Sequence, residues 1–313
     1  MQGEDALSAK DVYFCSQSYL ILAPLMDILH GTGVALVTPF AADFSIDYPA
    51  WHRLLDHCLE GGVEYLVING TTGESPTVRT DERAELLRTA KAHVAGRLPI
   101  MYGIGGNDTA AAIDLFHTVD LHGVFAVLSA SPAYSKPSQA GLVAHYQHLA
   151  DASPVPLVLY NVPGRTSSNL SADTTLRLAR HPNIVGVKEA SGNLEQCLTI
   201  GALKPAGFAL LSGDDMMTPA LIAAAGAVGA ISVMANAWPR RFSDMTRAAL
   251  AGDFPRARRL LFELLPLNPL MYEESNPVGV KAALAALGVC DASVRLPLVE
   301  ATPGLQDRLQ KLL

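Results

Sequence analysis

One lysine in this sequence occupies a position that suits covalent chemistry. Lys188 closes the apolar run Val185-Gly186-Val187, which has the pattern of a buried strand. Burial disfavours the charged ammonium and favours the neutral amine, which can attack a ketone to form a Schiff base. A lone lysine at a strand end more often reaches solvent, so the catalytic interpretation depends on the residues that accompany Lys188.

A threonine pair and two tyrosines accompany Lys188 in the sequence. Gly70-Thr71-Thr72-Gly73-Glu74 follows another apolar run, and its glycines allow a tight turn whose N–H groups and hydroxyls can hold a carboxylate. Tyr160 lies at the end of a further run and Tyr134 follows another, and a phenol can pass a proton when a hydroxyl such as that of Thr71 relays it. Taken singly, the segment is a plain turn and each tyrosine a core or rim aromatic. Glu74 fits a structural acceptor better than an acid catalyst.

Weaker signals follow other runs. Arg165, in a loop just after the fifth run, could bind a substrate carboxylate, although an isolated loop arginine is usually solvated surface. Gly103-Ile104-Gly105-Gly106-Asn107 resembles a phosphate cradle without the helix that would make it specific. Asp214-Asp215 could bind a divalent ion, but no third carboxylate stands at a suitable spacing, which favours a hydrogen-bonding role.

The elements that must position these residues form a repeating pattern. Apolar runs alternate with helical patterns, which predicts βαβ units and a parallel sheet whose strands are buried on both faces. Helices are predicted from Tyr48 to Glu60 with Asp47 as N-cap, from Thr80 to Ala95, and from Ser171 to Arg180. The eight predicted strands cover residues 33–38, 65–69, 99–103, 124–128, 157–161, 184–188, 208–212 and 229–233.

Eight such units without a long linker predict the α/β class and a closed (β/α)8 TIM barrel, with the active site at the carboxyl ends of its strands. A doubly wound open sheet is the alternative, but no GxGxxG fingerprint follows the first run. We expect an N-terminal extension over residues 1–30, poorly ordered and with Met26 as a possible natural start, a barrel over 31–238, and a helical subdomain over 239–313 with breaks at Pro266, Pro269 and Pro277.

Composition limits the partners and the compartment. The net charge is −7 and no basic run occurs, so nucleic acid is not an expected partner. The apolar stretch over residues 19–26 is too short to span a bilayer and lacks signal-peptide features, which predicts no membrane association and a cytoplasmic location. Four widely spaced cysteines, without CxxC or ligand spacing, predict reduced structural thiols and no metal site.

Together these residues resemble the dihydrodipicolinate synthase/N-acetylneuraminate lyase family of class I aldolases. The resemblance runs from about Gly31 to Leu298 and is carried by the turn at Gly70–Glu74, by Tyr160-Asn161-Val162-Pro163 and by the stretch from Val187 to Asn193. Thr71-Thr72 and the loop containing Arg165 resemble the synthase branch.

The resemblance implies a reaction and a role for each residue. Pyruvate would form an imine with a lysine and, as an enamine, condense with L-aspartate 4-semialdehyde to give 4-hydroxy-tetrahydrodipicolinate in lysine and diaminopimelate biosynthesis, without a metal or organic cofactor. A homotetramer is implied, with one relay tyrosine crossing a subunit interface. The implied roles are imine formation for Lys188, a proton relay for Tyr160, Thr71 and the neighbour's Tyr134, pyruvate binding for Thr72, Ile231 and Gly213, and aldehyde carboxylate binding for Arg165.

Two alternatives remain open, and one departure from the family stands out. Another pyruvate-dependent aldolase or lyase of the family, acting on a sugar acid or hydroxy-oxoglutarate, is the nearest alternative, and a non-catalytic pyruvate-binding barrel is the second. Lysine-inhibited members bind lysine with a tyrosine, a glutamate and histidines. Those places here hold Ala133, Ala111, Thr80 and Arg83, while Ser75 and Asn107 remain, which predicts weak or absent feedback inhibition by lysine.

Overall fold

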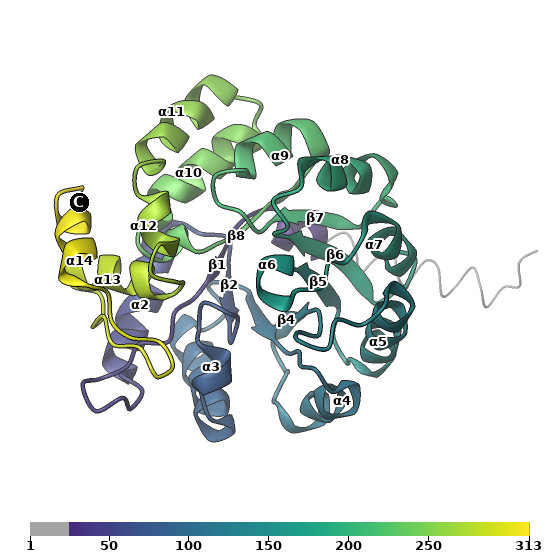
Figure 1. Ribbon diagram of the computed structural model, residues 1–313, viewed down its shortest axis with the longest axis horizontal. Helices are drawn as coiled ribbons and strands as arrows, with labels where there is room; N and C mark the ends of the chain where they lie inside the picture. Colours follow the sequence, from purple (N-terminus) through teal and green to yellow (C-terminus); the bar gives the residue numbers. More distant parts are fainter. Residues whose placement is uncertain (1–24, 313) are drawn as a thin grey trace, which may run out of the picture.

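The computed structural model describes residues 25–312 and contains a closed barrel of parallel strands, shown in Figure 1. The strands pair in sequence order, and the last strand returns to the first. All eight predicted strands and the predicted (β/α)8 barrel are confirmed, although the first strand begins at Gly31 and ends at Ala35. The strands are β1 Gly31–Ala35, β2 Tyr65–Ile68, β3 Ile100–Gly103, β4 Val124–Ala130, β5 Leu157–Asn161, β6 Ile184–Glu189, β7 Ala209–Ser212 and β8 Gly229–Ser232.

Helices surround the barrel on its outside (Figure 1). Asp47 caps α2 as predicted, because its Oδ1 accepts a 2.9 Å hydrogen bond from the Ala50 N–H. Ser171 caps α7, which ends at Leu178, short of the predicted Arg180, since Pro182 disfavours helical backbone before it. The helices up to the end of the barrel are α2 Tyr48–Gly61, η1 Ser75–Thr77, α3 Thr80–Val94, α4 Thr109–Thr118, α5 Gln139–Ala152, α6 Pro163–Thr166, α7 Ala172–Leu178, α8 Leu194–Leu203, α9 Thr218–Ala225 and η2 Met234–Asn236, and the short α6 lies over the barrel mouth rather than in the outer layer.

The barrel interior is filled with side chains rather than open. Alternate residues of the strands, among them Val67, Met101 and Val158, form one buried cluster inside the barrel. Gly33 is required there, because a Cβ at this position would lie only 2.1 Å from the ring of Tyr65.

Residues 25–29 form a helical turn that contributes Leu25 and Leu29 to the interior cluster. The predictions of poor order and of an N-terminal extension fall mainly on residues 1–24, which lie outside the described part of the chain.

Helices also follow the barrel, along one side of it in Figure 1. The predicted breaks at prolines are confirmed: Pro266 lies between α11 and α12, Pro269 lies in the first turn of α12, and Pro277 caps α13. The first of these helices, α10 (Pro239–Leu250), packs on α2, α9 and β1. The division of the chain at residue 239 stays a prediction. These helices are α10 Pro239–Leu250, α11 Phe254–Leu264, α12 Asn268–Tyr272, α13 Val278–Ala286 and α14 Pro303–Gln310.

The register between β5 and β6 positions the candidate catalytic residues. Tyr160 pairs with Lys188, and Asn161 pairs with Glu189. Because successive side chains of a strand point to opposite faces, the first pair faces the barrel interior and the second faces the helices. On the outer face, the Asn161 amide donates hydrogen bonds to both carboxylate oxygens of Glu189, at 3.1 and 3.0 Å.

Candidate active site

Lys188 and Tyr160 lie side by side at the mouth of the barrel. The Lys188 Nζ is 4.4 Å from the centroid of the Tyr160 ring, and the two residues are only 4% and 8% exposed. Within residues 25–312, no acidic side chain forms an ion pair with Lys188. The amine is therefore buried against an aromatic ring and is not committed to a carboxylate.

The outer-face partners fix the strand ends that carry this pair. One oxygen of Glu189 accepts a 2.8 Å hydrogen bond from the Ser191 N–H, and the other accepts one of 2.8 Å from the Gln196 amide. Asn161 in turn accepts a 2.9 Å hydrogen bond from the Leu170 N–H. These bonds hold the ends of β5 and β6 rigid, which is what precise placement of a reactive amine requires.

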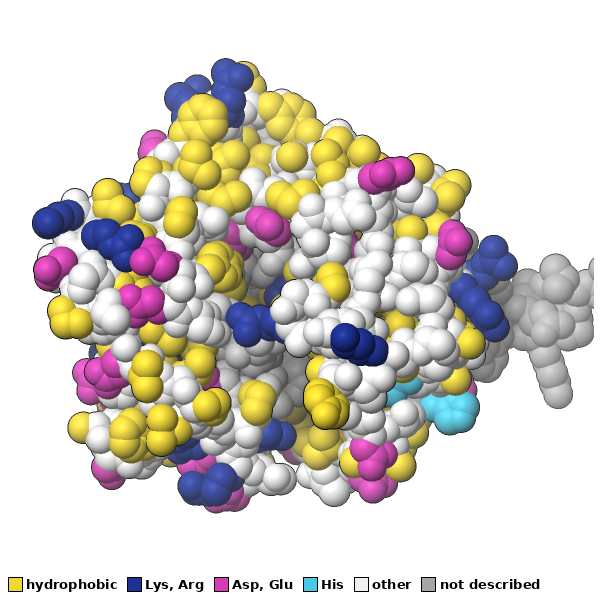
Figure 2. Space-filling view, viewed as in Figure 1, with side chains coloured by type: hydrophobic (Ala, Val, Ile, Leu, Met, Phe, Trp, Pro, Cys, Tyr) yellow, Lys and Arg dark blue, Asp and Glu magenta, His cyan; other side chains and the backbone are white. Residues whose placement is uncertain are grey.

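Lys188 opens onto a cavity of about 500 Å³ at the carboxyl ends of the strands. Figure 2 shows this face of the molecule hollowed near its centre, with basic side chains at the hollow. The structure brings together on its walls five of the residues predicted from the sequence. The cavity is lined by Thr72, Tyr160, Val162, Gly164, Arg165, Lys188, Ala190, Gly213, Asp214, Val233, Asn268, Tyr272, Ser275 and Asn276.

Gly213 makes room for the lysine. A Cβ at this position would lie 3.1 Å from the Lys188 Cε and 2.6 Å from the Ala190 Cβ. The absence of a side chain, rather than any group that Gly213 supplies, thus allows the aliphatic stem of Lys188 to reach the cavity.

The turn after β2 places its threonines on two different surfaces. Thr72 is 2% exposed, and its hydroxyl accepts a 3.1 Å hydrogen bond from the Asn276 amide. The Thr38 hydroxyl donates a 2.7 Å hydrogen bond to the Gly73 carbonyl, which closes the turn against β1. Thr71 lines a second, smaller cavity instead.

Glu74 anchors this turn, as predicted, through a buried ion pair. Its Oε1 lies 2.6 Å from the Lys281 Nζ, and both side chains are almost fully buried. Its Oε2 accepts a 3.0 Å hydrogen bond from the Arg295 N–H, and Lys281 also donates to the Ser293 carbonyl at 2.7 Å. Burial lowers the pKa of Lys281, while the charge of Glu74 opposes that shift. The role of Glu74 as a structural acceptor is confirmed.

Arg165 reaches the same cavity from α6, the short helix that follows β5. Its Nη2 donates a 3.4 Å hydrogen bond to the Asn276 carbonyl. Within residues 25–312 no carboxylate pairs with Arg165, so its charge is available to an anionic ligand.

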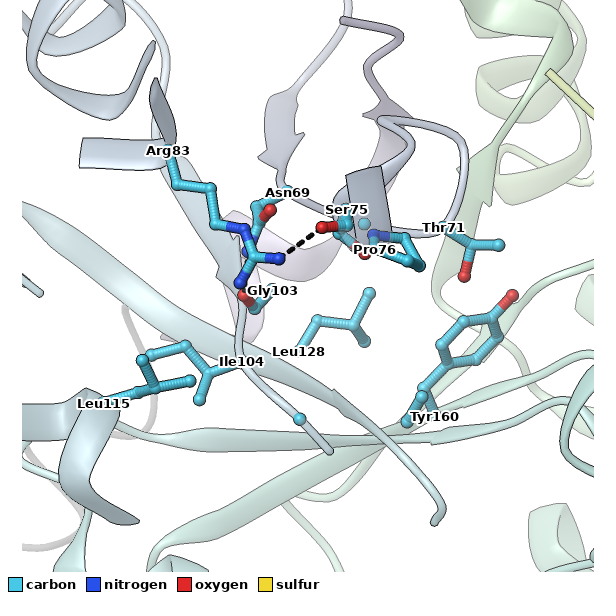
Figure 3. Close-up of a pocket in the computed structure, with 13 residues that line it drawn as sticks. Asn69, Thr71, Ser75, Pro76, Arg83, Gly103, Ile104, Leu115, Leu128 and Tyr160 are labelled. Atoms are coloured by element: carbon cyan, nitrogen blue, oxygen red, sulfur yellow. Dashed lines mark hydrogen bonds between the residues drawn. The ribbon is translucent and has the colours of Figure 1, made fainter. Parts of the chain in front are cut away.

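The second cavity, of about 220 Å³, adjoins the first through Tyr160. Figure 3 shows the hydroxyls of Thr71 and Tyr160 pointing toward one another at one end of it. At the other end lies Arg83, whose Nε donates a 2.8 Å hydrogen bond to the Val78 carbonyl and whose Nη2 donates to the Ser75 carbonyl.

Two predicted site residues do not line either cavity. Tyr134 is 91% exposed and has a left-handed backbone with φ of 66°. Ile231 is 1% exposed and belongs to the interior cluster that also contains Tyr160. In the single chain, Ile231 is therefore part of the barrel interior and Tyr134 is exposed.

Sequence reasoning missed the wall contributed by the C-terminal helices. Tyr272 and Asn276 line the main cavity from the end of α12 and the segment after it. The sequence signal for them is faint, since they are separate polar residues near two proline breaks and do not close an apolar run.

Asp215 has the hydrogen-bonding role that the sequence predicted. It is 2% exposed, and its Oδ2 accepts hydrogen bonds from the N–H groups of Val233 at 3.2 Å and Met234 at 2.8 Å. Burial raises the pKa of Asp215 to about 6, and hydrogen bonds from the Met234 N–H and the Ser232 side chain oppose that shift.

Metal and membrane features are absent from the described residues. Within residues 25–312, no three His, Cys, Asp or Glu side chains lie close enough together to hold a metal ion. None of the helices in that range is long and apolar enough to cross a membrane. Cys58, Cys197 and Cys290 are buried free thiols, as predicted, and Cys15 lies outside the described part.

The fold and the cavity define a (β/α)8 barrel protein whose candidate active site lies at the carboxyl ends of its strands. Residues 29–313 match the model of the dihydrodipicolinate synthetase family. The chain belongs to this family, which confirms the resemblance seen in the sequence.

Individual relatives agree with this assignment. The 4-hydroxy-tetrahydrodipicolinate synthase of Cytophaga hutchinsonii is 48% identical over 286 residues, which cover 91% of this chain and 96% of that protein. The corresponding synthase of Leptothrix cholodnii is 45% identical over 91% of this chain and 97% of its own length.

Solved structures show the same fold. The dihydrodipicolinate synthase of Thermotoga maritima matches with a TM-score of 0.88 and 36% identity, covering 91% of this chain and 97% of that chain. The chloride-inhibited dihydrodipicolinate synthase of Acinetobacter baumannii, solved in complex with pyruvate, matches with a TM-score of 0.88 and 37% identity over 91% of this chain and 97% of that chain.

The buried ion pair beneath the turn predicts a large stability effect. Replacing Lys281 by methionine leaves Glu74 charged, buried and unpaired, so we expect the free energy of unfolding to fall by about 3–5 kcal/mol in urea denaturation. The double variant Lys281→Met/Glu74→Gln should recover part of this loss. As the matched control, Arg308→Met removes a half-exposed pair with Glu273 and should cost less than about 1 kcal/mol. Equal losses in the two single variants would contradict the structural role of the Lys281 pair.

Proposed function

We propose that this enzyme condenses pyruvate with L-aspartate 4-semialdehyde through a Schiff base on Lys188, giving 4-hydroxy-tetrahydrodipicolinate. One observation carries the proposal: a buried amine without an ion-pair partner in the described chain shares a cavity with Tyr160, Thr72 and Arg165. The names of the relatives in the same family support the choice of substrates.

The first half of the reaction uses the deep end of the cavity. The Lys188 amine attacks the keto carbon of pyruvate, and loss of water leaves an imine. Thr72, which lines the cavity, holds the pyruvate carboxylate in this proposal. Loss of a methyl proton then gives an enamine, with the imine nitrogen as electron sink, so the chemistry requires neither a metal nor an organic cofactor.

Proton movements fall to the hydroxyls beside the amine. Tyr160 lies against Lys188, and its hydroxyl faces that of Thr71, so a proton can pass from one to the other. When the enamine carbon attacks the aldehyde carbon, the new C–C bond turns the aldehyde oxygen into a hydroxyl, and that oxygen needs one proton from this relay.

The second substrate occupies the outer part of the cavity. Arg165 is positioned for its carboxylate, and such a pair gives both affinity and orientation. The amino group of the substrate then attacks the imine carbon, the ring closes, and the bond to Lys188 breaks. The lysine leaves as a free amine, ready for the next pyruvate.

We also propose that the enzyme forms a homotetramer and is located in the cytoplasm. Tyr134 is exposed here and displayed on a left-handed backbone, as befits a residue that acts in a neighbouring subunit. The small cavity beside Thr71 and Tyr160 offers a place for such a phenol. Biosynthesis of an amino acid precursor from pyruvate fits the cytoplasm.

The first prediction tests the covalent step. Lys188→Ala should lower kcat with pyruvate and aspartate semialdehyde by more than about 1,000-fold, because the covalent route is lost. Borohydride reduction of the native protein with pyruvate, followed by peptide mass mapping, should find a carboxyethyl group on Lys188 and none in the variant. Lys311→Ala, at an exposed lysine, is the control and should behave as the native protein. Full activity in the Lys188 variant would refute the mechanism, and turnover only with a sugar acid or hydroxy-oxoglutarate would refute the substrate.

The second prediction tests the subunit crossing. Co-expressing Tyr134→Phe with Lys188→Ala chains should restore activity to on the order of one quarter of the native value. Half of randomly formed dimers are mixed, and each contains one complete site. The two variants expressed alone serve as the inactive references. No recovery in purified mixed oligomers would show that Tyr134 does not act across an interface.

The third prediction concerns inhibition by lysine. Arg83 points its guanidinium into the small cavity and forms no ion pair within residues 25–312, so it repels a cationic amino acid. We expect less than half-maximal inhibition by lysine at about 1 mM in a steady-state assay. The triple variant Arg83→His/Ala111→Glu/Ala133→Tyr should bind lysine more tightly. Half-maximal inhibition of the native enzyme by submillimolar lysine would contradict this prediction.

A further inference from the structure

A second tyrosine enters the main cavity from outside the barrel. Tyr272, the last residue of α12, lines the cavity together with Lys188 and Arg165 and is 40% exposed. Its hydroxyl oxygen lies 3.5 Å from the Oδ2 of Asp215. The mechanism above assigns no role to either residue.

The hydrogen-bonding capacity of Asp215 fixes the direction of this contact. The carboxylate is buried and already accepts from the N–H groups of Val233 and Met234, so its position is set by backbone. A carboxylate only accepts, so the Tyr272 hydroxyl must be the donor. The lone pairs of the tyrosine oxygen then remain free for a donor in the cavity.

The charges around Tyr272 have opposite signs on different sides. Burial of its hydroxyl end, followed by the negative charges of Asp215 and Asp214, raises the pKa of Tyr272, while Arg165 lowers it. Arg165 and Asp214 both line the cavity. The outer cavity therefore has a positive wall and a negative wall, which suits a zwitterion.

The second substrate of the proposed reaction has matching chemistry. Its carboxylate and its ammonium group sit on the same carbon, and only the carboxylate has a partner so far, in Arg165. We propose that the Tyr272 oxygen, oriented by Asp215, accepts a hydrogen bond from this ammonium group and so selects an aldehyde that carries an amino group beside its carboxylate over one without the amino group. Tyr272 is then a substrate-binding residue and Asp215 a positioning residue. This inference rests on the proposed function.

A plain structural role makes a different prediction. If the Tyr272 ring only forms an apolar wall, then removing its hydroxyl leaves the binding of both aldehydes unchanged. A distortion of this wall would weaken the binding of both aldehydes equally. Succinate semialdehyde separates the two cases, because it has the same carbon chain, carboxylate and aldehyde but no amino group. It should bind without help from the Tyr272 oxygen.

The test compares the two aldehydes in Tyr272→Phe at pH 8. We expect the KM for aspartate semialdehyde to rise about 10-fold, as for a lost hydrogen bond to a charged group, with the KM for pyruvate and the inhibition constant of succinate semialdehyde unchanged within about twofold. Borohydride trapping of pyruvate should remain complete. Tyr48→Phe, at a half-buried tyrosine on α2 outside both cavities, is the matched control and should leave all three constants unchanged.

A second variant tests the orienting role. Asp215→Ala removes Oδ2, the atom that accepts from the Tyr272 hydroxyl as well as from the Val233 and Met234 N–H groups, so the hydroxyl loses the acceptor that orients it. We expect the same selective rise in the KM for the amino aldehyde.

Several outcomes would overturn the inference. These are no change in Tyr272→Phe, an equal weakening of the binding of both aldehydes, a rise in the KM for pyruvate, or an Asp215→Ala enzyme that traps pyruvate completely and has native constants. A native enzyme that does not turn over aspartate semialdehyde at all would instead refute the proposed function, so the two failures are distinguishable.

Discussion

The pairing of β5 with β6 is the constraint on which the site depends. Their register sets Tyr160 beside Lys188 inside the barrel and Asn161 beside Glu189 outside it. The outer pair is hydrogen-bonded and buried, so it resists any slip of the strands. A slip of one residue would exchange the two faces and bring a carboxylate and an amide into the cavity in place of an amine and a phenol.

The Lys188 amine also depends on space that glycines leave free. Gly213 leaves room for the lysine stem, and Gly33 leaves room for Tyr65 in the layer inside the barrel. The C-terminal helices then cover one side of the opening, and Asn276 links them to the barrel by bonding to Thr72 and accepting from Arg165. The cavity is thus a joint product of strand ends and a later segment of chain.

Much of this arrangement could be predicted from sequence, because buried parallel strands have the pattern of apolar runs. The candidate site residues lie at or just after the ends of those runs. Lys188, Tyr160 and Thr72 were found in this way, and Glu74 was assigned its structural role. Tyr272 and Asn276 could not be found, since they lie on short segments between prolines, where no periodicity indicates which side chain faces the barrel. The apolar pattern does not indicate the exposure of Tyr134 either, because this residue lies in a loop after β4, where no periodicity marks the buried side chains.

The buried link from Glu74 to Lys281 and to the backbone of Ser293 and Arg295 joins two parts of the polypeptide separated by about two hundred residues. During synthesis the ribosome releases the turn after β2 long before it releases these partners. The Glu74 carboxylate in this turn therefore lacks its partners until Lys281 and residues 293–295 have left the exit tunnel. A nascent barrel with all eight strands in place would still lack the partners that fix the turn after β2, so the cavity wall that carries Thr72 would be incomplete on an unfinished chain.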